Sequence, residues 1–103
     1  LDAERANQRL VMRVYIVSYE LGKKKNYIGL YEQLKASPGW WHYLDSTWLI
    51  ATQENANQLC DRLRPHLDKE DKILAIEAGT EFYGWLPEKS WKWIHRNLLG
   101  LPE

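Results

Sequence analysis

An acidic residue, Glu20, directly follows the first apolar run of the chain. That run, Val14 to Tyr19, is rich in β-branched and aromatic residues and predicts a strand, so Glu20 stands where the strand ends and a Gly/Lys loop begins. In a two-fold dimer, two such carboxylates could meet near the axis. Paired carboxylates suit Mg²⁺ or Mn²⁺, which activate water for phosphodiester cleavage. A simpler interpretation is also open, in which Glu20 is a solvated strand end or pairs with a lysine of the loop.

Two short basic groups are the candidate contacts for a nucleic-acid backbone. Lys23, Lys24 and Lys25 lie in the loop after the first strand, and Arg62 and Arg64 lie in a later helical stretch. The whole chain carries 14 Lys and Arg against 14 Asp and Glu, so it has no net field that would attract a polyanion. Nucleic-acid binding would therefore need one of these local patches, and the alternative for each is a solvated face.

The remaining polar groups have structural explanations. His42 and Asp45 are three residues apart in a strand-turn segment, and this spacing does not define a catalytic pair. The side chains of Asp45-Ser46-Thr47 can close a turn by bonding to the backbone.

Cys60 is the single cysteine and the chain has three histidines, so an internal disulfide is excluded and a four-ligand zinc site is short of ligands. The six Trp and six Tyr favour packing, with stacking on unpaired bases as the alternative.

The elements that would position these residues follow from apolar periodicity and from the residues that interrupt it. Asn55 and Gln58 have the spacing of a capping box, Asn26 is a candidate N-cap, and Pro87 and Gly100 suit the start and stop of a closing helix. The predicted elements are a strand over 14–20, a helix over 27–34, two strands within 40–52 that divide near 44–46, a helix over 56–67, a strand over 73–78 and a short helix over 87–98.

This order predicts an α+β domain with the ferredoxin-like β-α-β-β-α-β pattern. Right-handed crossovers place two helices on one face of a four-stranded antiparallel sheet, with a short C-terminal helix added. The opposite sheet face would then be bare and rich in aromatic residues, so something has to cover it. The two candidates are a second copy of the chain, packed sheet to sheet in a two-fold dimer, and the segment from Phe82 to Trp93 folded back over the sheet of its own chain or of its partner. We favour the homodimer.

Length bounds the domain organisation. The 103 residues fit one domain, expected at 13–99. Met12 could be the natural start, so residues 1–12 are expected to be an extension or an expression remnant, and 100–103 a tail. No apolar run approaches the roughly 20 residues of a membrane span, and no signal-peptide pattern is present. We therefore expect a cytoplasmic protein without a membrane partner.

Four segments carry a resemblance to known proteins between Arg13 and Trp93. They are Val14-Tyr15-Ile16-Val17-Ser18-Tyr19-Glu20-Leu21, Tyr27-x-Gly29-Leu30-Tyr31-x-x-Leu34, Trp41-x-x-Leu44-Asp45-Ser46-Thr47-Trp48-Leu49 and Asp61-Arg62-Leu63-x-x-x-Leu67-Asp68-x-x-Asp71. This pattern resembles a group of small bacterial and phage proteins labelled SinR-like, although the chain shows no repressor helix-turn-helix. More distantly it resembles the ferredoxin-like superfamily of the small CRISPR spacer-acquisition subunit, a CRISPR-associated endoribonuclease, and the VapD toxins, many of which are homodimers.

The resemblance implies two functions. Nuclease activity in that superfamily is linked to an acidic residue at the end of the first strand, commonly Asp, where this chain has Glu20. The first hypothesis is therefore a homodimeric, Mg²⁺- or Mn²⁺-dependent endonuclease of RNA or DNA. In it, Glu20 of each chain binds the ion, Ser18 and Ser46 position phosphate or water, and no other cofactor is needed. The alternative is a non-catalytic dimeric module that binds protein or nucleic acid in a phage-defence or toxin-antitoxin system, because the spacer-acquisition dimer can bridge DNA without cutting it.

Overall fold

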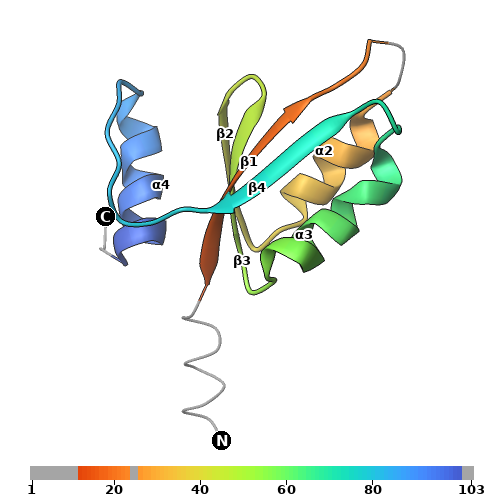
Figure 1. Cartoon of the computed structure of the whole chain (residues 1–103). Helices are drawn as coiled ribbons and strands as arrows, with labels where there is room; N and C mark the ends of the chain where they lie inside the picture. Colours follow the sequence, from red (N-terminus) through yellow and green to blue (C-terminus); the bar gives the residue numbers. More distant parts are fainter. Residues whose placement is uncertain (1–11, 24–25, 101–103) are drawn as a thin grey trace, which may run out of the picture.

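A computed structural model describes residues 12–23 and 26–100. The expectations for residues 1–11 and 101–103, and for Lys24 and Lys25, lie outside these ranges. The elements appear in the predicted order (Figure 1). They are β1 (Arg13–Glu20), α2 (Ile28–Lys35), β2 (Gly39–Leu44), β3 (Thr47–Thr52), α3 (Ala56–Leu63), the 3₁₀ turn η1 (Arg64–His66), β4 (Lys72–Glu77) and α4 (Glu88–Leu99).

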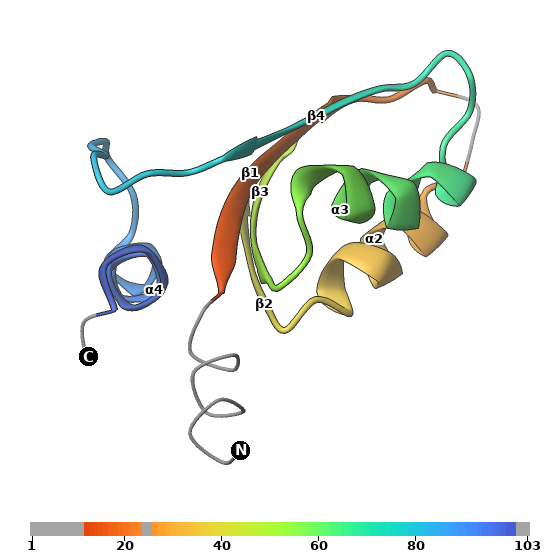
Figure 2. The same cartoon turned by 60° about the horizontal axis from the view of Figure 1, so that its bottom comes forward.

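The strands form one antiparallel sheet in the order β2-β3-β1-β4. Helices α2 and α3 lie on one face of this sheet, and α4 lies on the opposite side (Figures 1 and 2). This is the ferredoxin-like arrangement with an added C-terminal helix, so the predicted α+β fold class is confirmed. In the part of the chain that the structure describes, no helix is long and apolar enough to cross a membrane.

The helix ends follow local chemistry. The capping box at α3 is confirmed, because Gln58 N–H donates to Asn55 Oδ1 and Asn55 N–H donates to Gln58 Oε1, each at 2.8 Å. The predicted extension of this helix to Leu67 is wrong, since α3 ends at Leu63 and a 3₁₀ turn follows. Pro65 explains the change, because its missing N–H cannot continue the α-helical ladder.

The main core lies between the sheet and helices α2 and α3. Its central side chain is Trp48, which is 1% exposed and donates its indole N–H to the Tyr19 hydroxyl at 2.9 Å. Tyr31 of α2 stacks on the Trp48 ring with 6.2 Å between centroids. The fully buried side chains of this core come from both layers: Tyr15, Val17, Leu30, Leu34, Trp48, Ile50, Leu59 and Leu63.

A second, smaller core forms on the other face, beneath α4. Ile94 is 4% exposed and belongs to the same buried cluster as Trp41 of β2 and Leu49 of β3. Gly39 allows this approach, because a Cβ there would lie 3.0 Å from the Ala51 Cβ and 3.7 Å from the Trp93 ring. The C-terminal segment thus folds back over its own chain's sheet, which was one of the two predicted ways of covering this face.

The cover provided by α4 is incomplete. Ile16 of β1 stays 40% exposed, and Leu74 and Ile76 of β4 stay 57% and 53% exposed. In the strand register Ile16 is opposite Ile76, and Leu74 is opposite Ser18, so these side chains share one face. We call Ile16, Leu74 and Ile76 the open strip.

Replacing Ile94 with Ala tests the docking of α4. We expect the free energy of unfolding to fall by about 2–5 kcal/mol, because the change leaves a cavity in the second core. Urea denaturation measures this, with Leu99→Ala on the exposed side of the same helix as the control. An Ile94→Ala variant as stable as the control would mean that α4 does not pack on its own sheet in solution.

Candidate functional site

The predicted catalytic residues come together at one end of the sheet. Glu20 is the last residue of β1, is exposed, and is opposite Lys72, the first residue of β4. Ser18 precedes it by two residues and is half-buried, so both side chains lie on the face that carries the open strip. Ser46 lies in the β2–β3 turn, where its carbonyl accepts the Tyr19 N–H at 3.2 Å. Glu20 and Ser18 thus share one face at the end of β1, whereas Ser46 is joined through its backbone to Tyr19, whose side chain packs on the α2/α3 face.

Lys72 was not anticipated from the sequence. Directly opposed residues of antiparallel strands have Cβ atoms about 4.5–5.5 Å apart, so Lys72 is the neighbour of Glu20 across the two strands, while its ammonium donates to the Glu70 carbonyl at 3.3 Å. Only the register of β1 against β4 reveals this neighbour, because 52 positions separate the two residues in the sequence. At this end, the face that carries the open strip thus presents the Glu20 carboxylate and the Ser18 hydroxyl, with Lys72 on the neighbouring strand.

The oxygen ligands at the end of β1 fit a divalent cation only if two copies of the chain share the ion. Among the described residues, no group of three or more His, Cys, Asp or Glu side chains could hold a metal ion. Mg²⁺ is commonly held by one or two carboxylates together with water and substrate phosphates. One Glu20 carboxylate satisfies that pattern when water, phosphate and the carboxylate of a second copy complete the shell.

The predicted basic residues are dispersed. Lys23 is exposed, three positions after Glu20, at the same end of the sheet. Arg62 and Arg64 lie at the C-terminal end of α3. The structure therefore brings Lys23 near the Glu20 end and places the two arginines elsewhere on the helical layer.

Arg62 is occupied by structural contacts. Its guanidinium donates to both carboxylate oxygens of Glu54 at 2.9 Å, and also to the Gln33 carbonyl and the Ser37 hydroxyl. The Arg62 and Glu54 side chains are only 24% and 27% exposed. This network joins α3 to the end of α2 and to the turn after β3, so Arg62 serves the fold, and its predicted role at a phosphate has no support from this placement.

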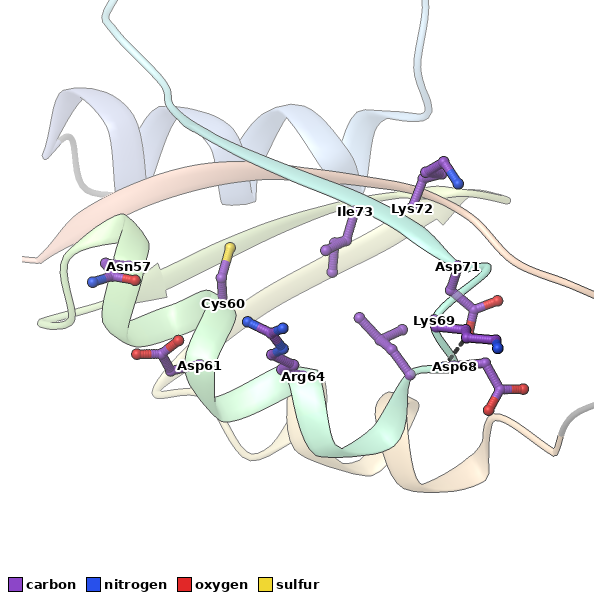
Figure 3. A pocket seen from close by; sticks show the side chains of 10 residues that line it. Asn57, Cys60, Asp61, Arg64, Asp68, Lys69, Asp71, Lys72 and Ile73 are labelled. Atoms are coloured by element: carbon purple, nitrogen blue, oxygen red, sulfur yellow. Dashed lines mark hydrogen bonds between the residues drawn. The ribbon is translucent and has the colours of Figure 1, made fainter.

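Arg64 faces a different feature, a groove between α3 and β4 of about 670 Å³ (Figure 3). In Figure 3, Arg64 and Cys60 extend from the α3 side toward Ile73, whereas Lys72 points away from the groove. The lining mixes charges of both signs and apolar groups: Asn57, Cys60, Asp61, Arg64, Leu67, Asp68, Lys69, Asp71, Lys72 and Ile73. Opposite charges this close together give the groove no preference for an anion or a cation.

Two groups of the groove that could do chemistry are restrained. Burial, and next the Asp61 carboxylate, raise the pKa of the Cys60 thiol, so it is a poor nucleophile at neutral pH. The Asp71 carboxylate accepts from Gly22 N–H at 2.9 Å, from the Tyr27 hydroxyl at 2.7 Å and from Asp68 N–H at 2.7 Å. The groove is therefore a weaker candidate for catalysis than the end of β1.

The structural interpretation of His42 is supported. Its ring stacks on Trp48 with 3.9 Å between centroids and 10° between planes, and Nε2 lies 3.0 Å from the Asp45 carbonyl oxygen. That carbonyl also accepts from the Tyr19 hydroxyl at 3.3 Å. His42 and Asp45 hold the β2–β3 turn, and the Asp45 carboxylate has no contact with His42 in these bonds.

Comparison of the chain with family models, with curated proteins and with solved structures gives no match. The resemblance to SinR-like, spacer-acquisition and VapD proteins therefore stays a sequence-based prediction, while the geometry at Glu20 stands on its own.

The Arg62–Glu54 pair leads to a pH-dependent test. Hydrogen bonds from Arg62, the largest effect, and from Thr52 lower the pKa of Glu54 below its ordinary 4.5, although burial opposes them. The contribution of ionised Glu54 to the free energy of unfolding is thus fully present above about pH 4.5 and is lost as the pH falls through the lowered pKa of Glu54. We expect Arg62→Gln to reduce the free energy of unfolding by about 2 kcal/mol at pH 7 and to flatten this acid dependence.

Urea denaturation between pH 7 and pH 3 provides the measurement. Arg64→Gln is the matched control, because it removes an exposed arginine two positions away. Equal stability and equal acid dependence in the two variants would contradict the structural role assigned to Arg62.

Proposed function

We propose that the protein is a homodimeric, metal-dependent endonuclease of RNA or DNA, acting in the cytoplasm and resembling the small CRISPR spacer-acquisition subunit and VapD. The observation that carries this proposal is that the open strip ends at Glu20. The proposed dimer interface and the proposed catalytic carboxylate thus lie on the same sheet face.

The open strip suits a second copy of the chain. Ile16, Leu74 and Ile76 form a contiguous apolar surface that a monomer would leave in water. Glu20 and Lys72 flank this surface at one end, and a two-fold interface is self-complementary when each face offers both charges. The net charge of zero adds no repulsion between copies.

The residues at the end of β1 then have defined tasks. Glu20 from each copy binds the divalent ion, which supplies Lewis-acid stabilisation and a more acidic bound water when present. Ser18, on the same face, offers a hydroxyl to phosphate or water, and Ser46 offers another from the adjoining turn. Lys72 and Lys23 offer cations to the phosphate backbone at this edge. Because the end of the strip meets solvent, a strand of nucleic acid can reach these groups while the strip itself is buried.

A second candidate is a non-catalytic dimeric module that binds protein or nucleic acid. The observation that favours it is the position of Lys72 opposite Glu20, which gives the carboxylate a cation within its own chain. In this version the pair stabilises the dimer or holds a partner, and no metal is needed.

Introducing a charge into the open strip tests the dimer. We expect the wild-type chain to elute as a dimer in size-exclusion chromatography with light scattering, and Leu74→Glu to be a monomer, because an unpaired buried carboxylate costs several kcal/mol. Ile28→Glu, at an exposed apolar residue of α2 on the other side of the sheet, is the control and stays dimeric. A wild-type monomer at all accessible concentrations would refute the proposed assembly.

Cleavage assays test the catalytic part. We expect labelled single-stranded or duplex RNA or DNA to be cut with Mg²⁺ or Mn²⁺ and to stay intact with EDTA. Glu20→Gln should lower the rate about a hundredfold or more, because a metal-bound carboxylate supports several kcal/mol of transition-state stabilisation. Glu20→Asp keeps the carboxylate and should retain cleavage. Glu32→Gln, an exposed carboxylate on α2, is the matched control.

The two candidate functions predict different results in this assay. Cutting that needs metal and disappears only in Glu20→Gln supports the nuclease. Equal cutting by wild type and Glu20→Gln would indicate a contaminant, and no cutting by either protein would remove the catalytic proposal and leave the binding module.

A further inference from the structure

Two aromatic side chains in the segment between β4 and α4 are almost entirely in water. Tyr83 is 86% exposed and Trp85 is 87% exposed, and their rings meet edge to face with 5.5 Å between centroids. Aromatic residues lower the free energy of a fold mainly by burial. Tyr83 and Trp85 contribute little to the core, so their exposure indicates a surface that binds a ligand or partner.

An aromatic hollow lies next to them. It has a volume of about 300 Å³ and is formed by the 79–87 segment together with the first turns of α4. Phe82 and Trp91 stack with 6.2 Å between centroids, and His95 lies beside both rings at 5.8 and 6.2 Å. The lining residues are Phe82, Tyr83, Gly84, Trp91 and His95. A space of this size and character accepts one flat ring.

The exposed side of α4 carries three cations and one carboxylate, Glu88 in the first turn, so it is positive on balance. Lys89, Lys92 and Arg96 are spaced three and four residues apart, so they form one stripe on the helix, and all three are exposed. The buried Ser90 and Ile94 face the opposite way, toward the sheet. We call Lys89, Lys92 and Arg96 the basic stripe. By helical spacing it runs beside the side of α4 that carries Trp91 and His95.

We propose that this surface binds single-stranded nucleic acid. One or two unpaired bases stack on Tyr83, Trp85 and the aromatic hollow, while the basic stripe contacts the adjoining phosphates. Stacking platforms flanked by cations are the general means of holding single strands, because every base has a π-face and every linkage a negative charge. A duplex offers its phosphates but keeps its bases stacked inside, so it can use only half of the site.

A second copy of the chain is a poorer occupant of this surface. Two basic stripes meeting across a two-fold axis would repel each other. The open strip, moreover, offers a second copy an apolar surface that Glu20 and Lys72 flank with both charges. Figures 1 and 2 show the 79–87 segment running along α4, on the side of the sheet away from α2 and α3. Glu20 lies at the other end of β1, so the α4 surface binds the strand apart from the place of proposed cleavage.

This inference deepens the proposed function by naming single strands as the ligand. It rests on the proposed function in one respect, namely that the molecule bound is a nucleic acid. Binding at α4 does not require Glu20, so all binding is measured in the Glu20→Gln background, in which strands are not cut. Fluorescence anisotropy follows labelled oligo(rU), oligo(dT) and a duplex of equal length at several salt concentrations. The two oligonucleotides show whether RNA or DNA is preferred.

Two pairs of variants provide the comparison. We expect Tyr83→Ala to weaken single-strand binding about tenfold, the loss of one stacked base, whereas Tyr43→Ala, an exposed tyrosine on β2, leaves it unchanged. We expect Lys92→Gln to reduce the slope of log affinity against log salt by about 0.7, the value for one phosphate contact, and Lys69→Gln not to change it. Circular dichroism confirms that the variants are folded.

The outcomes separate this inference from the proposed nuclease. Weaker single-strand binding by Tyr83→Ala and a smaller salt slope for Lys92→Gln, with both controls unchanged, support the α4 site whether or not the wild-type protein cuts nucleic acid. Binding that the α4 variants and their controls reduce equally, or a duplex bound as tightly as a single strand, overturns the inference and leaves cleavage at Glu20 as a separate question. If no oligonucleotide binds the Glu20→Gln protein even at low salt, the α4 inference fails, and the cleavage assay with the wild-type chain decides the proposed nuclease separately.

Discussion

A sheet has two faces, and the described residues of this chain cover them unequally. The helices α2 and α3 close one face around Trp48, and α4 closes part of the other around Ile94. What remains uncovered follows from where α4 lies, because Ile94 packs in one cluster with Trp41 of β2 and Leu49 of β3, while Leu74 and Ile76 of β4 stay exposed. The open strip on β1 and β4, with Glu20 at its end, is the consequence. The proposed dimer and its carboxylate thus occupy the part of the sheet that the chain itself leaves bare.

Most of the fold could be predicted from local patterns. Alternating and β-branched runs marked the strands, and the Asn55–Gln58 capping box marked the start of α3, because both signals act between residues close in sequence. The end of α3 was missed, since the apolar stripe continues to Leu67 while Pro65 interrupts the backbone ladder. Which partner covers the second sheet face was left open, because no local signal states whether an apolar helix docks on its own chain or on another.

The site was predictable to a smaller extent. Glu20, Ser18 and Ser46 lie at the same end of the sheet because antiparallel pairing of β1 with β3 follows from the predicted topology. Two facts needed the three-dimensional structure. Lys72 is opposite Glu20 only through the register of β4, and Arg62 is committed to Glu54 through a turn that sequence spacing does not define. Residue type alone therefore did not reveal that Arg62 is engaged by Glu54, and it did not reveal Lys72 as the residue opposite Glu20.

The inward side of α4 stabilises the fold, and its outward side carries the proposed binding surface. Its inward side, with Ser90 and Ile94, is buried against the sheet, so changes there act on the whole fold. Its outward side carries the basic stripe beside Trp91, and no side-chain contact described above ties Lys89 or Lys92 to the rest of the chain. Charged residues in water add little to stability, and exposed aromatic rings lose the benefit of burial. A helix that needed only to cover the sheet would have no use for Tyr83 and Trp85 beside it, and it is this surplus that points to a ligand.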